Sequence, residues 1–183
     1  MVADRAAIEI RRHTARHHDD WGHLTNAGVA LARQAGSSMG PFDLVVASPL
    51  PRAAETAIAM GFGIDREIQE LAVVGEAAMA EIDWPMGFAE FARRMIPGSG
   101  VATRGAELRD LLATLAADLP HDGAALALSH GAVIEMAAVA SCPAADFAAW
   151  GGPCGHCEGV RLDYLDAVCV AADPIRVPGA TGR

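Results

Sequence analysis

Lysine is absent from this sequence of 183 residues, so all 14 of its basic residues are arginines. Together with 23 acidic residues they give a formal net charge of -9. Nucleic acids and anionic membranes favour proteins with a broad basic face, and this balance argues against both as partners. Any site for an anion must therefore be local, and the planar fork of arginine suits phosphate and carboxylate groups.

The N-terminus also lacks the apolar stretch of about seven residues or more that a secretion signal needs. We therefore expect a cytoplasmic protein whose four cysteines stay reduced. Residues 123–142 are as long as a spanning helix, but Ser129-His130-Gly131 interrupts them and Glu135 follows, which argues against a membrane segment. With no visible repeat or linker and 52% hydrophobic residues, we expect one domain over residues 1–183.

Short apolar runs alternate with helical patterns along the chain. We expect a short first strand that includes Ile8 and Ile10 and ends at Arg11 or Arg12, and further strands at 43–47 and 124–128. A weaker strand is expected at 62–68, and two antiparallel strands around Asp166 within 159–173. Helices are expected at 26–36, with Thr25 as the N-cap, and at 51–61, 87–95, 106–119 and 132–140. This alternation predicts an α/β fold, a three-layer sandwich with a mainly parallel central sheet flanked by helices.

Polar residues follow the three clearest strands, where parallel sheets bind their ligands. Arg12 and His13 come after the first strand, Arg52 lies a helical turn past the second, and His130 follows the third. We expect these four side chains to meet at one edge of the sheet, although any one of them alone is more often a cap or surface residue. Arginines can hold a phosphoryl group through paired hydrogen bonds, and a neutral histidine can attack its phosphorus atom.

Four segments carry a family resemblance. The segments IRRHTAR, VVASPLPRAAETA and LALSHG resemble the three signature segments of the histidine phosphatase superfamily, in the family's order. HLTNAGVALARQAG resembles the helix that follows the first of them. The matches span about Ile8 to Ile134, and the family includes phosphoglycerate-mutase-like enzymes and phosphohistidine phosphatases.

The resemblance implies a phosphoglycerate mutase-like fold in which His13 accepts the phosphoryl group. Arg12, Arg52 and His130 would complete the phosphate pocket. The family usually has glycine where this sequence has Thr14, and the added side chain is expected to narrow the pocket or to contact phosphate.

The resemblance also implies a carboxylic acid that protonates the leaving oxygen. Many relatives place a glutamate in a segment like D-x-x-L-x-E, and DREIQEL offers Glu70 in that register. Glu76 and Glu81 remain alternatives, and each of the three glutamates could instead be a solvated surface residue. The acid needs hydrogen-bond reach to the leaving oxygen and a pKa raised by desolvation.

Metal binding is the main alternative chemistry. Cys154 and Cys157 form a CxxC segment around His156, and His17, His18 and His23 lie in the first loop. A structural zinc site usually needs four ligands, and here a second cysteine pair is missing. A redox CxxC should precede a helix, whereas the sequence after Cys157 reads as a strand. We therefore expect no metal and no cofactor.

The loop residues His17, His18, Asp19 and Asp20 are expected near the pocket mouth. The apolar segment 71–91, with Trp84, Met86 and Phe88, is either a lid or an amphipathic helix packed on the sheet.

Together these features predict metal-independent hydrolysis of a phosphomonoester, on a small molecule or on a phosphorylated protein side chain, through a phosphohistidine on His13. Two alternatives stay open: a phosphoglycerate mutase-type phosphotransferase and a non-catalytic phosphate-binding or assembly module. The short chain, without a long insertion, favours hydrolysis. The sequence defines neither the substrate nor the oligomeric state.

Overall fold

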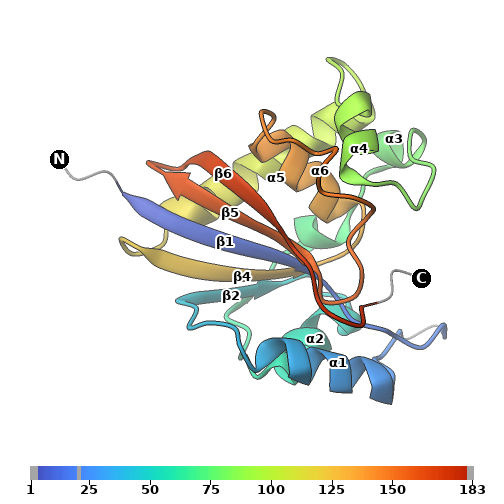
Figure 1. Ribbon diagram of the computed structural model, residues 1–183, viewed down its shortest axis with the longest axis vertical. Helices are drawn as coiled ribbons and strands as arrows, with labels where there is room; N and C mark the ends of the chain where they lie inside the picture. Colours follow the sequence, from blue (N-terminus) through green and yellow to red (C-terminus); the bar gives the residue numbers. More distant parts are fainter. Residues whose placement is uncertain (1–3, 20–21, 181–183) are drawn as a thin grey trace.

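The computed structural model of the protein describes residues 4–19 and 22–180 and contains one six-stranded sheet (Figure 1). The strand order is β3-β2-β4-β1-β5-β6. The strands are β1 (Arg5–Arg12), β2 (Leu44–Ala47), β3 (Arg66–Glu67), β4 (Gly123–Ser129), β5 (Gly159–Leu165) and β6 (Val168–Ile175). The first four run parallel, β5 is antiparallel to β1, and β6 is antiparallel to β5. The mainly parallel sheet is therefore confirmed.

Helices cover both faces of this sheet, which confirms the three-layer arrangement (Figure 1). One face carries α1 (Asn26–Gly36) and α2 (Pro51–Met60). The other face carries α5 (Gly100–Ala117) and α6 (Val133–Ser141), with α3 (Glu76–Met79), α4 (Phe88–Arg94) and a short 3-10 helix, η1 (Gln69–Ala72). None of the helices in the described part of the chain has the length and apolar character needed to cross a bilayer.

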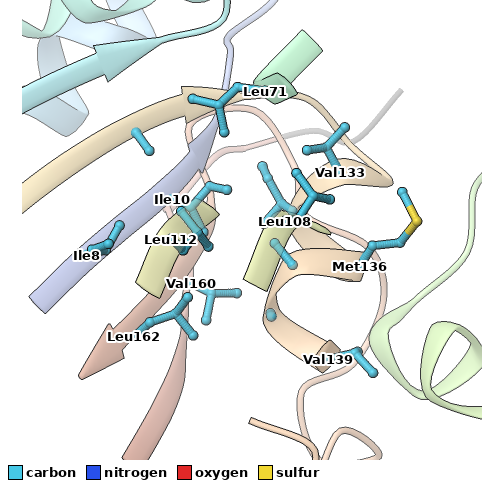
Figure 2. Packing of buried hydrophobic residues seen from close by; sticks show 14 of the residues in the cluster. Ile8, Ile10, Leu71, Leu108, Leu112, Val133, Met136, Val139, Val160 and Leu162 are labelled. Carbon is cyan, nitrogen blue, oxygen red and sulfur yellow. The ribbon is translucent and has the colours of Figure 1, made fainter. Parts of the chain in front are cut away.

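The apolar strands are buried because each face of the sheet packs against helices. On one face, Ile8 and Ile10 of β1 belong to a core that includes Leu108 and Leu112 of α5 (Figure 2). A smaller core on the opposite face joins α1 and α2 to the strands, with members Ala32, Val45, Ala47, Ala53, Ala57, Met60, Leu126, Leu128 and Cys157. The sheet is thereby held rigid beneath the residues that follow its strands.

Helix boundaries follow from capping contacts. Thr25 caps α1 as expected, since its Oγ1 accepts a hydrogen bond from the backbone N–H of Gly28 at 3.0 Å. The helix predicted at 106–119 begins earlier, at Gly100, because Ser99 caps it by accepting from the N–H of Ala102 at 2.9 Å. The sequence showed the amphipathic part of this helix but not its capped first turns.

The edges of the sheet differ in how well they were predicted. The weak strand expected at 62–68 shrinks to β3, because Asp65 turns back to accept a hydrogen bond from the N–H of Val45 at 2.7 Å. The two antiparallel strands around Asp166 are confirmed. Asp166 and Ala167 both have positive φ, 48° and 60°, as a tight hairpin turn requires.

Candidate active site

A cavity of about 220 Å³ opens at the carboxyl edge of the parallel strands. The register pairs Arg12 of β1 with Ser129 of β4, so the residues that follow the two strands lie side by side. The cavity is lined by Arg12, His13, Ala15, Arg16, His18, Arg52, His130 and His156. The structure thus brings together four of the predicted site residues, and no carboxylate of the described chain lines the cavity.

His13 lies at the end of β1 with its ring centroid 5.1 Å from that of His130. Its Nδ1 lies 2.7 Å from the carbonyl oxygen of Thr14. A carbonyl only accepts, so the proton belongs on Nδ1 and the lone pair on Nε2. Burial lowers the pKa of His13 to about 2, and the positive charges of Arg52 and Arg12 add to this effect. His13 is therefore neutral at physiological pH.

His130 is held from two sides. Arg52 Nε donates to its Nδ1 at 3.2 Å, and its Nε2 lies 2.8 Å from Ser48 Oγ. Burial, and then the positive charge of Arg52, lower the pKa of His130 to about 3. Ser48 and Arg52 thus fix the ring orientation of a second neutral histidine.

Arg12 is fixed by the segment that precedes β5. Its Nη1 donates to the carbonyl of Cys154 at 2.7 Å, and its backbone N–H donates to the carbonyl of Glu158 at 2.7 Å. The guanidinium carbon lies 5.7 Å from the ring centroid of Trp84. Burial lowers the pKa of Arg12 from its ordinary value, although an arginine remains charged near neutral pH.

Thr14 does not contact the pocket, so the expectation that it narrows the pocket or binds phosphate is wrong. Its side chain is fully buried, and its Oγ1 donates to the carbonyl of Gly28 in α1 at 3.1 Å. Its backbone N–H donates to Thr56 Oγ1 in α2 at 3.1 Å. Thr14 therefore anchors the residue after the nucleophile to the helical layer behind it.

Two of the three candidate acids lie elsewhere. Glu81 caps α5 by accepting from the N–H groups of Gly100 at 2.7 Å and Val101 at 3.0 Å. These bonds lower the pKa of Glu81, which is opposite to the shift an acid needs. Glu76 is exposed in the first turn of α3 and lines a separate hollow beside α5.

Glu70 lies at the same edge of the sheet as the cavity. Its neighbour Leu71 accepts a hydrogen bond through its carbonyl from Ser129 Oγ at 2.7 Å, one residue before His130. Arg104 Nη2 donates to the carbonyl of Glu70 at 2.6 Å. The backbone of Glu70 is therefore fixed, while its side chain is exposed and outside the cavity lining.

Sequence reasoning missed the place of His156 in the cavity. His156 is buried, with its ring centroid 6.3 Å from that of His13. His18 reaches the cavity from the first loop, as expected. His17 is exposed, and His23 instead pairs with Glu55. Asp20, which was expected near the pocket mouth, lies outside the described residues.

The two cysteines of the CxxC segment are buried thiols packed inside the protein. Cys154 and Cys157 are fully buried, and burial raises the pKa of Cys157 to about 11. Over residues 4–19 and 22–180, no three histidine, cysteine or acidic side chains come together as metal ligands. The backbone N–H of Cys154 instead donates a hydrogen bond to Oε1 of Glu135, a buried residue of α6, at 2.8 Å.

Segment 71–91, which the sequence presented as either a lid or a packed helix, has a buried part and an exposed part. Met86 and Phe88 are buried in the core, as the packing interpretation required. Trp84 is 41% exposed and lies against the site: a Cβ on Gly131 would come within 2.4 Å of its ring. Gly131 is therefore needed where Trp84 packs beside His130.

A mainly parallel sheet whose central strand ends in an Arg-His pair, completed by a second arginine and a second histidine, has the arrangement expected of a histidine phosphatase. The model of the histidine phosphatase superfamily (branch 1) matches residues 10–170, and the chain belongs to this family.

Solved structures with the same fold come from several organisms. A mycobacterial glucosyl-3-phosphoglycerate phosphatase has a TM-score of 0.65 at 20% identity, over 98% of this chain and 100% of that one. An Entamoeba histolytica phosphoserine phosphatase in complex with 3-phosphoglyceric acid has a TM-score of 0.64 at 16% identity, over 94% and 98%. A Bacillus anthracis phosphoglycerate mutase has a TM-score of 0.62 at 15% identity, over 97% and 94%. No curated protein matches the sequence.

Proposed function

We propose that the protein hydrolyses phosphomonoesters through a phosphohistidine on His13. This proposal rests on the Nδ1 contact to Thr14, which leaves the Nε2 lone pair of His13 available for attack. Arg12, Arg52 and His130 line the same cavity and would hold the phosphoryl oxygens. A neutral nucleophile among positive groups suits attack on a phosphoryl dianion.

The reaction has two steps. His13 Nε2 forms a bond to phosphorus while the bond from phosphorus to the leaving oxygen breaks, and Glu70 gives that oxygen a proton. Water then attacks phosphorus, the N–P bond breaks, and the carboxylate of Glu70 takes a proton from the water. Arg12 and Arg52 stabilise the equatorial oxygens in both steps, and His130 joins them when its Nε2–H donates to the phosphoryl group in place of Ser48 Oγ.

Glu70 is assigned as the acid because its segment lies beside the end of β4. Glu81 is already used as a helix cap, so of the three candidate glutamates Glu70 is the one whose segment contacts the residue before His130. Its exposed side chain would reach over the mouth of the cavity when a substrate occupies it.

We further propose that the reaction needs no metal ion. The guanidinium groups of Arg12 and Arg52 supply the positive charge that a metal would supply in other phosphatases. The cavity of about 220 Å³ suits a small phosphorylated molecule better than a folded protein surface. Two of the similar structures are named as phosphatases of small phosphorylated molecules and one as a mutase, so phosphotransfer between alcohols is the second candidate.

The test is hydrolysis of p-nitrophenyl phosphate by wild type and His13→Ala, with and without chelator. We expect the variant to lose at least about 10³-fold in kcat, as losing a nucleophile does. His121→Ala is the matched control, because His121 is exposed and pairs with Asp4 outside the cavity. Mass spectrometry of acid-sensitive phosphate on His13 tests the intermediate.

Activity that survives in His13→Ala would overturn the assignment of the nucleophile. Loss of wild-type activity in chelator would contradict the metal-free reaction. Tight phosphate binding without any hydrolysis would favour a binding module.

A further inference from the structure

Arg16 is a third arginine in the cavity, and the proposed chemistry does not use it. We propose that Arg16 binds a second anionic group of the substrate, so that the preferred substrates are small phosphorylated acids. This inference rests on the proposed hydrolysis and names its substrate class. The second group is a carboxylate or another phosphate on the alcohol part of the ester.

The first loop holds Arg16 in place. Arg16 forms an antiparallel bridge with Leu24, and the N–H of His17 donates to the carbonyl of His23 at 2.8 Å. Arg16 Nη1 donates to the carbonyl of His17 at 3.0 Å. Both the backbone and the side chain are therefore positioned, and less conformational entropy is lost when an anion binds.

Arg16 lies next to the phosphate cluster. A Cβ built on Gly22 would lie 3.7 Å from Arg16 Nη1 and 3.8 Å from Arg52 Nη1, so both guanidinium groups border one backbone position. The charge of Arg16 also contributes to the lowered pKa of Arg52, after burial. A ligand bound by Arg52 is thus within reach of Arg16.

Neighbouring guanidinium groups repel each other unless an anion lies between them. In the described ranges, 4–19 and 22–180, no carboxylate forms an ion pair with Arg16. Arg12 and Arg52 already match the two charges of a phosphoryl group. The positive charge of Arg16 is in excess of what one phosphomonoester needs, and a second anionic group would neutralise it.

The position of Arg16 in the cavity also determines which part of the substrate it contacts. Arg16 and the exposed His18 come from the first loop, whereas His13 and His130 follow buried strands. The phosphoryl group belongs at the buried end, so the loop side chains face the alcohol part at the cavity mouth. Specificity would then lie in the leaving alcohol.

The experiment compares two esters that differ in one group, glycerol 3-phosphate and 3-phosphoglycerate, with glycerol 1,3-bisphosphate as a third arm. One charged hydrogen-bonded contact predicts that wild type prefers an acidic ester by about 10- to 100-fold in kcat/KM. Arg16→Gln should reduce this ratio to within about threefold of 1, mainly through KM. Arg16→Lys should keep part of the preference.

Arg33→Gln is the matched control, since Arg33 is exposed in the last turn of α1 and does not line the cavity. It should keep the wild-type ratio. The 3-phosphoglycerate and bisphosphate arms tell whether the second group is a carboxylate or a phosphate. The preference should also weaken as salt is added.

Equal kcat/KM for neutral and acidic esters in wild type would overturn the inference while the proposed hydrolysis stands. An equal loss on both esters in Arg16→Gln would overturn it too, because Arg16 would then act on the phosphoryl group. If no ester is hydrolysed, the proposed function fails, and calorimetric binding of the same esters to wild type and Arg16→Gln tests the inference separately.

Discussion

Arg52 Nε lies 3.2 Å from Nδ1 of His130, and this contact fixes which nitrogen of the imidazole carries the proton. A guanidinium only donates, so Nδ1 must accept. The proton of the neutral ring is then on Nε2, which donates to Ser48 Oγ at 2.8 Å. The pair therefore keeps a histidine neutral beside an arginine, and protonation of the ring would break the contact.

This arrangement predicts that acid destabilises the protein. The pKa of His130 is about 3 in the folded protein and near 6.5 in the unfolded chain, so the unfolded chain binds more protons between these values. Stability therefore falls as pH drops below 6.5, by about 2 kcal/mol from His130 alone at pH 5. Urea unfolding at pH 7.5 and pH 5.0 measures the loss, and His130→Gln should show a loss smaller by about that amount. An identical pH dependence in the variant would refute the assignment.

Glu70→Gln should impair hydrolysis according to the leaving group. Alkyl phosphates need a proton on the departing oxygen, so we expect a loss of about 10²- to 10³-fold in kcat. A dinitrophenyl ester leaves without protonation, and its hydrolysis should fall less than about tenfold. Steady-state rates on the two esters give the ratio, with Glu67→Gln in the exposed strand β3 as the control. Similar losses on both esters would show that Glu70 is not the acid.

Arg104 positions the segment that carries Glu70. Its buried guanidinium donates to the carbonyls of Glu70 at 2.6 Å and Val73 at 3.0 Å. Arg104→Met should lower the free energy of unfolding by about 1 to 3 kcal/mol. It should also reduce the rate of hydrolysis of alkyl phosphates about tenfold more than that of dinitrophenyl phosphate. Arg104→Lys should restore part of the alkyl activity, and Arg109→Met, exposed on the same helix, is the control. A uniform loss on both esters would indicate a purely structural role.

Ala132 is strained directly after the His130-Gly131 pair. Its φ of 68° and ψ of -47° lie outside the regions that a residue with a Cβ prefers. Glycine relieves this strain, so Ala132→Gly should raise the free energy of unfolding by about 1 kcal/mol. Chemical denaturation measures the change, and a variant less stable than wild type would show that the turn is not strained.

The four residues of the phosphate cluster could be predicted because each lies at, or shortly after, the carboxyl end of a parallel strand. His156 could not be found in this way, because it precedes β5, which runs antiparallel to β1. The start of an antiparallel strand lies at the same edge as the end of a parallel one. The alternating pattern of 159–165 predicted the strand itself but not its direction.

Side-chain directions at two other positions could not be predicted either. Thr14 follows the nucleophile in sequence, yet its side chain points toward α1, because its hydroxyl donates a hydrogen bond to the carbonyl of Gly28. Glu81 caps a helix that begins 19 residues later in the chain. Both contacts depend on tertiary packing, which local sequence patterns do not encode.

The central place of β1 also bears on how the chain is made. β1 pairs with β4 on one side and with β5 on the other, and β5 ends at Leu165. β1, which precedes His13, is therefore made before both of its partners and pairs with residues far away in the sequence. The pairing of β1 must wait until β4 and β5 have been made, and such non-local pairing slows folding relative to a sheet built from neighbouring strands.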